Sequence, residues 1–287
     1  MANEVCPVCE NRLHPGYQSW HSLCRHCGYE KSDLQPAINL DITHKLIDES
    51  SRETGLRELR IENFRVLLEI LKLIKPGGGR LLDVGCAHGW FLDIAKQDFE
   101  VLGVEPDKSV FEVTSKRGLP VRFGYFPEAL EASEKFDVIV FNDVIEHIQD
   151  VGNILSECKA HLNDNGLLLL NIPNSRGTFY RLSKLFSLLG AHSFFERLWQ
   201  KSFPSPHLHY FNSLNINQLL ERSQFKVERC GYLPSLKFKG LYSRISYTNG
   251  DRFIVNSLVY LILTIFLLPI IHVLPKDIVF VIGKKMN

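Results

Sequence analysis

Residues 80–95 read RLLDVGCAHGWFLDIA, and this stretch decides the fold. The apolar run at 81–84 is short and ends at a glycine, which predicts a buried β-strand. Residues 85–89 then form a tight loop with glycine at both ends, and Trp90 opens a helix. A strand, a glycine loop and a helix in this order let the backbone pass close to a ligand and direct helix N–H groups at it.

Apolar strands and helices alternate outward from this stretch. Helices are expected at 51–75, ahead of the first strand, and at 151–162. Further strands are expected at 101–104, 121–124, 136–141, 166–172 and 225–232. Such alternation predicts an α/β fold, a Rossmann-like doubly wound sheet. Ligands of these sheets bind beyond the carboxyl ends of the strands.

Two acidic residues at these strand ends indicate the kind of ligand. Glu105 lies about 20 residues beyond Asp83, at the end of the next strand. A carboxylate in that place accepts hydrogen bonds from both hydroxyls of a ribose, so a nucleoside-containing cofactor is expected. Asp83 enters the glycine loop itself, where its charge would repel a pyrophosphate but suits a cationic cofactor.

Three motifs resemble those of class I S-adenosylmethionine-dependent methyltransferases: DVGCAHG at 83–89, GVEPD at 103–107 and FDVIVFNDVIEHIQD at 136–150. The third is most similar to the branch related to ubiquinone-biosynthesis O-methyltransferases. The resemblance implies S-adenosylmethionine as cofactor and a seven-stranded sheet whose last strand, at 278–283, is antiparallel. It also implies that the cofactor site contains Asp83, Gly85, Cys86, Gly89, Glu105, Tyr125, Phe126, Asn142, Asp143 and Val144.

The sequence departs from the family pattern at two places. Ala87 stands where the family has its middle glycine, so the loop must be slightly more open. Tyr125 and Phe126 stand where the family often has an acid for the adenine amine. Adenine is therefore expected to be held by aromatic stacking.

Three histidines are candidates for a catalytic base. Methyl transfer from a sulfonium mainly requires alignment of the acceptor with the methyl group. A hydroxyl acceptor also benefits from a base, for which histidine suits neutral pH. His147 follows the fourth strand, and His207 and His209 lie in PSPHLHYF. The alternative for each is a capping or packing role.

The N-terminus contains two Cys-x-x-Cys pairs, Cys6 with Cys9 and Cys24 with Cys27. Four thiolates at this spacing predict a structural zinc ribbon over 1–30, with two redox pairs as the alternative. A polar linker is expected at 31–51 and the methyltransferase domain at 52–287. The remaining cysteines (Cys86, Cys158 and Cys230) are expected to be core or loop residues and not nucleophiles. Without a signal-peptide pattern at the N-terminus, a cytoplasmic protein with reduced cysteines is expected.

Two apolar inserts interrupt the expected domain, at 178–203 and 253–274. The first predicts one or two amphipathic helices, with a break at Gly190, which form a substrate lid or lie on a bilayer surface. The second is long enough to span a membrane. A single crossing is disfavoured, because the strand at 278–283 must return to the sheet. Insertion into one leaflet and a buried or dimer-forming helix remain the alternatives.

The predicted function is methyl transfer to a hydroxyl of an amphiphilic or lipid-linked small molecule or glycan. The protein would then be cytoplasmic or peripheral to the inner face of a membrane. Nucleic acid is not a favoured partner, because the formal net charge is only +1. The alternatives are an RNA methyltransferase with the ribbon as a clamp and a non-catalytic cofactor-binding subunit. The oligomeric state is not predicted.

Overall fold

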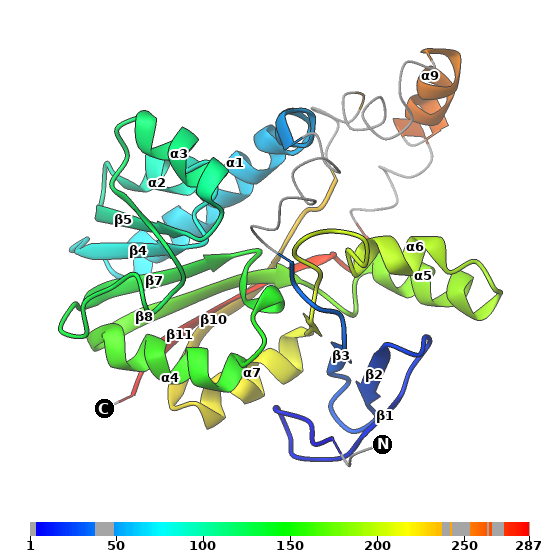
Figure 1. Ribbon diagram of the computed structural model, residues 1–287, viewed down its shortest axis with the longest axis horizontal. Coiled ribbons are helices and arrows are strands. Elements are labelled where there is room, and N and C mark those ends of the chain that lie inside the picture. Colours follow the sequence, from blue (N-terminus) through cyan, green and yellow to red (C-terminus); the bar gives the residue numbers. More distant parts are fainter. Residues whose placement is uncertain are drawn as a thin grey trace.

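A seven-stranded sheet forms the centre of the computed structural model, which describes residues 4–37, 49–236, 242, 253–262, 264–265 and 273–286. The strand order is β10-β11-β8-β7-β4-β5-β6 (Figure 1). The strands are β4 (Arg80–Val84), β5 (Glu100–Glu105), β6 (Val121–Phe123), β7 (Phe136–Asn142), β8 (Leu162–Pro173), β10 (Phe225–Leu233) and β11 (Ile278–Lys285). This confirms the predicted α/β class and Rossmann-like sheet.

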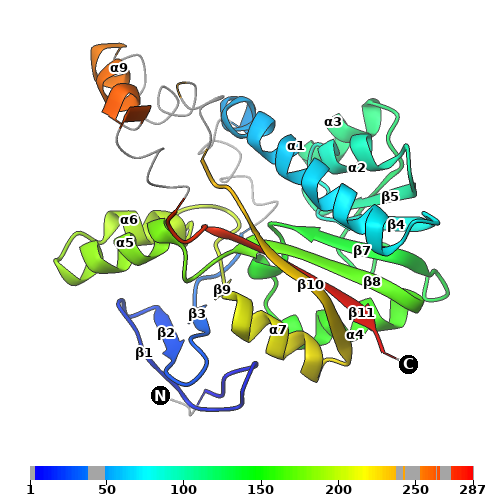
Figure 2. The ribbon, with the colours of Figure 1, turned by 180° about the vertical axis from the view of Figure 1, so that it is seen from behind.

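Helices cover both faces of the sheet (Figures 1 and 2). One face carries α1 (Glu49–Ile74), α2 (Trp90–Ala95) and α3 (Lys108–Lys116), and the other carries α4 (Val151–His161) and α7 (Ser213–Arg222). Successive strand residues point to opposite faces. Leu167 and Leu169 of β8 accordingly join the core under α1 and α2, whereas Leu168 and Leu170 join the core over α4 and α7. Burial on both sides explains why these strands read as continuous apolar runs.

The C-terminal strand returns to the sheet as predicted. β11 lies between β8 and β10 and is antiparallel to both, and Leu233 at the end of β10 pairs with Ile278 at the start of β11. Helix α9 (Phe253–Ile262) is the described part of the second apolar insert, together with 264–265 and 273–274; the rest of 253–274 lies outside the described residues. Within the described ranges, no helix is both long and apolar enough to cross a bilayer.

The N-terminal residues form a second, four-stranded sheet in the order β1-β2-β3-β9. Its first three strands are β1 (Leu13–Pro15), β2 (His21–Cys24) and β3 (Glu30–Ser32). The fourth, β9 (His209–Tyr210), comes from the methyltransferase domain and pairs antiparallel with β3. The start of the expected linker is therefore a strand, because β9 supplies partners for its backbone groups.

The first apolar insert forms two helices, α5 (Thr178–Leu188) and α6 (Ser193–Leu198). They are separated at Gly190, whose φ of +87° is readily adopted only by glycine among common residues. The predicted break is confirmed. In Figures 1 and 2 the pair lies beside the N-terminal sheet, at the end of the central sheet from which β11 begins.

Candidate active site

The glycine loop after β4 has the backbone that a ligand-binding turn requires. Gly85, Ala87 and Gly89 all have positive φ, at +67°, +45° and +69°. A Cβ atom on Gly85 would come within 2.7 Å of a Val144 methyl carbon, so the residues after β7 lie directly against this loop. Ala87 takes the left-handed conformation despite its side chain, at a cost in strain. The buried side chain of Cys86 packs with Leu92 and Leu119.

Glu105 at the end of β5 binds the loop through its carboxylate. Its Oε2 accepts the Ala87 N–H at 2.8 Å and its Oε1 accepts the Asp107 N–H at 2.8 Å. The side chain is 6% exposed. The predicted ribose-binding acid therefore also fixes the loop that the cofactor would contact, because charged acceptors make the stronger hydrogen bonds.

Asp83 and Asn142 lie at the carboxyl ends of the neighbouring strands β4 and β7. Within the described ranges, Asp83 Oδ1 and Asn142 Nδ2 are buried without a hydrogen-bond partner. Burial raises the pKa of Asp83 to about 8; the Asn142 side chain opposes this rise and the Glu105 charge adds to it. Orphaned buried polar atoms are costly unless a ligand satisfies them. The residues present therefore fit a polar, cationic cofactor such as S-adenosylmethionine.

Of the other predicted cofactor residues, Asp143 and Tyr125 are placed where they can contact a cofactor, whereas Phe126 is buried. Asp143, with a φ of +56°, follows β7 and pairs with Arg60 of α1 at 3.2 Å, so the residues after β7 stay beside the loop. Tyr125 is 52% exposed and remains available for stacking. Phe126 is buried and meets Phe141 edge-on, with ring centroids 5.9 Å apart. The expected stacking role therefore does not suit Phe126, because its ring belongs to the core.

Just beyond Val144, the short 3-10 helix η2 (Ile145–His147) carries part of a second cluster. The ligand atoms of Glu146, His147 and His207 lie within 4.8 Å of one another, and the two imidazoles meet with centroids 4.7 Å apart. Glu146 is buried, and within the described ranges neither of its carboxylate oxygens has a hydrogen-bond partner. Burial raises its pKa well above the usual range, and the Asp143 charge contributes. Such a group can exchange protons or hold a cation.

The three candidate histidines differ in what their ring nitrogens bind. His147 Nδ1 lies 2.9 Å from the Pro206 carbonyl oxygen, which can only accept, so Nδ1 carries the proton and Nε2 is the basic nitrogen. His207 Nε2 lies 2.8 Å from the Gln200 side-chain nitrogen. His209 donates from Nε2 to the Ile148 carbonyl and accepts the Tyr29 hydroxyl at Nδ1. Burial lowers the pKa of His209 to about 4.

This geometry brings His147 and His207 together and places His209 between two structural partners. Glu146 is the residue that the sequence reasoning missed. Its position beside His147 in the DVIEH stretch was a signal, because adjacent titratable residues just past the end of a strand are candidates for a functional site.

The four N-terminal cysteines converge as the spacing predicted. Cys6 and Cys27 have their sulfurs 3.5 Å apart, and Cys9 and Cys24 have theirs 3.4 Å apart. All four sulfurs lie within 4.8 Å of one another and none is in a disulfide. A tetrahedral zinc ion with four thiolate ligands needs sulfurs this close. The cluster is thus compatible with zinc.

Comparison with known proteins agrees with the fold and the strand-end site described above. A family model described as "Methyltransferase domain" matches residues 56–229. A ubiquinone biosynthesis O-methyltransferase of Bradyrhizobium diazoefficiens is 30% identical over 113 residues, 37% of this chain and 45% of that protein. The protein of the same name from Azorhizobium caulinodans is 28% identical over 126 residues, 42% and 49% of the two chains. The chain thus spans about half the length of the curated relatives it matches.

Solved structures show the same fold. A possible histamine N-methyltransferase of Thermotoga maritima, described as S-adenosylmethionine-dependent, aligns with a TM-score of 0.55 at 16% identity, over 84% of this chain and 97% of that one. An S-adenosylmethionine-dependent methyltransferase of Archaeoglobus fulgidus aligns with a TM-score of 0.51 at 17% identity, over 80% and 97%. At these identities the likeness concerns the fold alone.

Proposed function

Since the chain belongs to the methyltransferase domain family and is an S-adenosylmethionine-dependent methyltransferase, we propose that it methylates a hydroxyl group of an amphiphilic or lipid-linked small molecule or glycan. S-adenosylmethionine would supply the activated methyl group. Asp83, Gly85, Glu105 and Asn142 would hold the cofactor at the strand ends. His147 would accept the proton of the acceptor hydroxyl.

The tautomer of His147 is the observation that best supports oxygen as the methylated atom. Its Nδ1–H donates to the Pro206 carbonyl, so Nε2 has the lone pair that a general base needs. The residue lies three positions after Val144, which packs against the glycine loop. A base there stands next to the expected methyl donor. A hydroxyl needs a base in the transition state more than a neutral amine does, which favours an oxygen acceptor.

An amphiphilic acceptor is supported by the outer surface of α5. This helix buries Tyr180, Ser183 and Ser187 and exposes its leucines, unlike a typical amphipathic helix on a water-exposed surface. The exposed apolar residues are Leu182, Leu185, Phe186 and Leu188 of the helix and Leu189 at its C-cap. Arg181 and Arg197 are exposed on the same helix pair. An apolar surface with basic neighbours suits anionic lipid headgroups.

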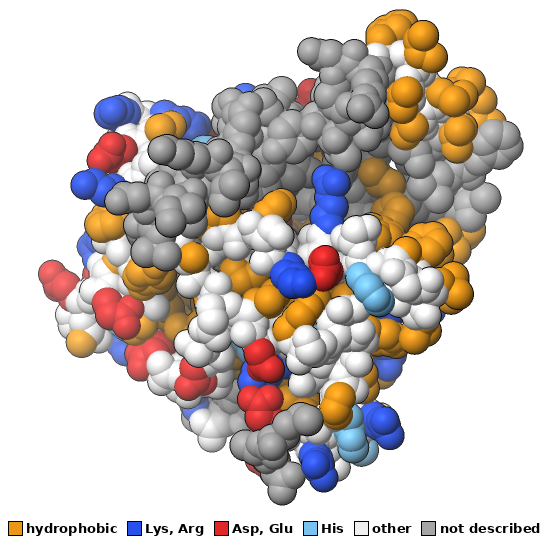
Figure 3. Space-filling view, turned by 45° about the vertical axis from the view of Figure 1, so that its right-hand side comes forward, with side chains coloured by type: hydrophobic (Ala, Val, Ile, Leu, Met, Phe, Trp, Pro, Cys, Tyr) orange, Lys and Arg blue, Asp and Glu red, His pale blue; other side chains and the backbone are white. Residues whose placement is uncertain are grey.

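Helix α9 has the same inverted character. It buries Asn256 and exposes Phe253, Ile254, Leu258 and Leu261. In Figure 3 the hydrophobic side chains of α9 and of α5 and α6 both lie on the right-hand side of that face. We therefore assign this side of the molecule to a membrane surface from which a lipid-linked acceptor is taken.

Incubation with labelled S-adenosylmethionine and fractionated cell extract tests the acceptor class. Label is expected in the lipid or lipid-linked glycan fraction and to be base-stable, as an ether is. His147→Gln should lower the rate by about 100-fold or more, while S-adenosylhomocysteine binds as before. His14→Gln, a substitution on the N-terminal sheet, is the matched control. Label in RNA or protein, or full activity of His147→Gln, would contradict the proposal.

Liposome co-sedimentation tests the membrane surface separately. The protein is expected to bind vesicles of phosphatidylcholine with about a quarter phosphatidylglycerol more tightly than vesicles of phosphatidylcholine alone. The double variant Leu185→Ser/Phe186→Ser should lose most of this binding. Leu73→Ser changes a leucine on α1 that is even more exposed, at 82% against 51% for Leu185, and should retain this binding. Equal loss in both variants would remove α5 from the membrane contact.

A further inference from the structure

The third strand of the N-terminal sheet is bonded to the backbone next to His207. The Ser32 N–H donates to the Leu208 carbonyl at 2.9 Å, and the Ser32 hydroxyl donates to the His207 carbonyl at 2.7 Å. Both Ser32 and His207 are buried. Residues 4–32, called the ribbon from this point on, therefore fix the backbone of His207, a member of the cluster that Glu146, His147 and His207 form.

The opposite side of the same backbone is bonded to η2. The Leu208 N–H donates to the Glu146 carbonyl at 2.7 Å, and His209 Nε2 donates to the Ile148 carbonyl at 2.7 Å. Tyr29 of the ribbon in turn donates its hydroxyl to His209 Nδ1. Residues 207–209 thus lie between the ribbon and the segment that carries Glu146 and His147.

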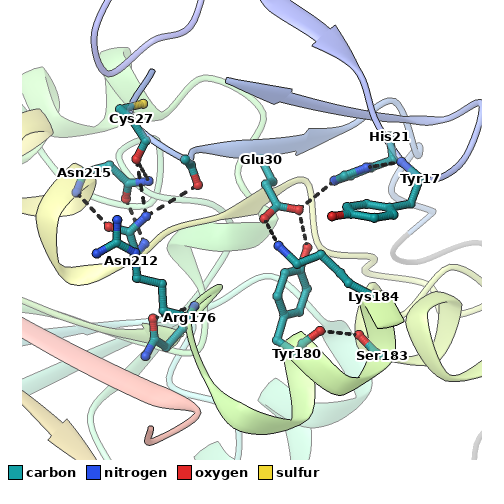
Figure 4. Close-up of polar contacts among 12 residues, drawn as sticks. Tyr17, His21, Cys27, Glu30, Arg176, Tyr180, Ser183, Lys184, Asn212 and Asn215 are labelled. Carbon is teal, nitrogen blue, oxygen red and sulfur yellow. Dashed lines mark hydrogen bonds and ion pairs between the residues drawn. The ribbon is translucent and has the colours of Figure 1, made fainter. Parts of the chain in front are cut away.

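A second link joins the ribbon to α5 through Glu30 (Figure 4). Glu30 is buried, and its carboxylate accepts from the Tyr180 hydroxyl at 2.8 Å and from Lys184 Nζ at 2.7 Å. His21 of the ribbon lies 2.9 Å from the same carboxylate. A buried carboxylate persists only where partners of this kind compensate its desolvation. Because Tyr180 stacks on Tyr210, with centroids 4.2 Å apart, α5 is connected back to β9, which follows His207 in the chain.

The four-cysteine cluster is joined to these links through Cys27. Asn212 and Asn215, which form the capping box of α7, direct their side-chain amides at the Cys27 carbonyl at 3.4 Å. Tyr29, Glu30 and Ser32 follow Cys27 within five residues. A segment of this size holds its shape poorly without a metal ion or a disulfide.

We propose that the ribbon is the structural support of the acceptor side of the active site, and that metal bound by its four cysteines holds His207, Glu146 and α5 in place. Ser32, Tyr29 and Glu30 are the positioning residues. The hydrogen bonds described above join the ribbon to residues 207–215 and to α5, so we expect the cofactor side, from Asp83 to Glu105, to keep its protection from hydrogen exchange when the metal is removed. This inference rests on the proposed function, which identifies the acceptor side of the active site. The contacts between the ribbon and residues 207–209 do not depend on that function.

Hydrogen exchange and cofactor binding test the proposal on the full chain. The zinc-loaded protein, the protein stripped by a chelator, and the double variant Tyr29→Phe/Ser32→Ala are compared. Peptides covering 206–211 and 178–188 are expected to exchange about tenfold faster or more in the stripped protein. In the double variant the same increase is expected for 206–211, because two buried hydrogen bonds are lost. Peptides covering 83–105 should not change, and the S-adenosylhomocysteine dissociation constant should stay within about twofold.

Two further variants separate positioning from general damage. Tyr17→Phe removes a hydroxyl that makes no hydrogen bond among the described residues of the ribbon, and should behave as wild type. Ser32→Thr keeps the hydroxyl that Ser32→Ala removes, so the peptide covering 206–211 should exchange as slowly in Ser32→Thr as in the wild type. With the labelled extract fraction as acceptor, Ser32→Ala should raise the acceptor KM and leave the S-adenosylmethionine KM unchanged.

The outcomes separate this inference from the proposed function. Unchanged exchange at 206–211 after metal removal would overturn the inference even if methyl transfer is found. Equal loss of protection at 83–105 would also overturn it, because the ribbon would then support the whole domain. Failure of wild-type protein to bind S-adenosylhomocysteine would instead contradict the cofactor site.

Discussion

Replacing Glu105 with glutamine tests the cofactor site most directly, because the substitution keeps the size of the side chain and removes its charge. The carboxylate accepts two backbone N–H bonds, from Ala87 and Asp107, each at 2.8 Å. Glutamine has one oxygen and can accept only one of them. The other N–H would then face an amide NH₂ group.

Glu105 both holds the glycine loop and is expected to bind the ribose, so its substitution should lower both the stability of the protein and its affinity for the cofactor. A hydrogen bond to a charged group contributes about 1.5–3 kcal/mol, so the lost loop bond should lower the free energy of unfolding by that amount and the melting temperature by about 4–10 °C. Loss of a charged acceptor for the ribose hydroxyls would cost a similar free energy in binding. S-adenosylhomocysteine affinity should therefore fall about 10- to 150-fold.

Calorimetric titration with S-adenosylhomocysteine and thermal unfolding by circular dichroism measure the two effects. Glu100→Gln is the matched control, because it changes the same residue type at the opposite end of β5, where the side chain is 74% exposed in its pair with Arg80. That control should change neither quantity by more than about 0.5 kcal/mol. A dissociation constant unchanged in Glu105→Gln would refute the ribose role, whatever happens to the melting temperature.

Three more predictions concern neighbouring features. Burial raises the pKa of Asp83 to about 8, and a cationic ligand requires the ionised carboxylate. The affinity for S-adenosylmethionine should therefore rise up to tenfold per pH unit until about pH 8 and stay constant above it. Titrations at several pH values should show this rise for the wild type and not for Asp83→Asn. Gly85→Ala should lower the melting temperature more than Gly118→Ala. Both glycines have positive φ, but only at Gly85 would an added Cβ meet a neighbour, a Val144 methyl carbon at 2.7 Å. Equal decreases in melting temperature would show that this steric contact does not matter. Elemental analysis should find about one zinc per chain, absent from Cys9→Ser/Cys24→Ser; a full complement in that variant would place the metal elsewhere.

Local sequence pattern predicted the alternating strands and the doubly wound sheet, whereas the antiparallel last strand at 278–283 was expected from the family resemblance. Glycines at 85 and 89 occupy positive-φ positions that few other residues tolerate, so they mark the loop without any tertiary information. The apolar runs of β7 and β8 are buried on both faces, and continuous runs of that kind occur where helices cover both sides of a sheet.

The contact between ribbon and domain could not be predicted in the same way. β9 contains two residues, and its partner strand precedes it by most of the chain, so neither propensity nor periodicity indicates the pairing. Glu30 is the last residue of the predicted zinc ribbon, next to the polar linker expected at 31–51, yet Lys184, Tyr180 and His21 make its burial tolerable. Burial of a charge depends on partners that only the folded chain brings together.

The pairing of Leu233 with Ile278 has a consequence for how this protein can vary. Everything between these two residues departs from and rejoins the sheet at adjacent points, so the sheet itself sets no constraint on the length of the intervening chain. Closure entropy grows only with the logarithm of that length. Connecting segments of different length or composition are therefore compatible with the same seven-stranded sheet.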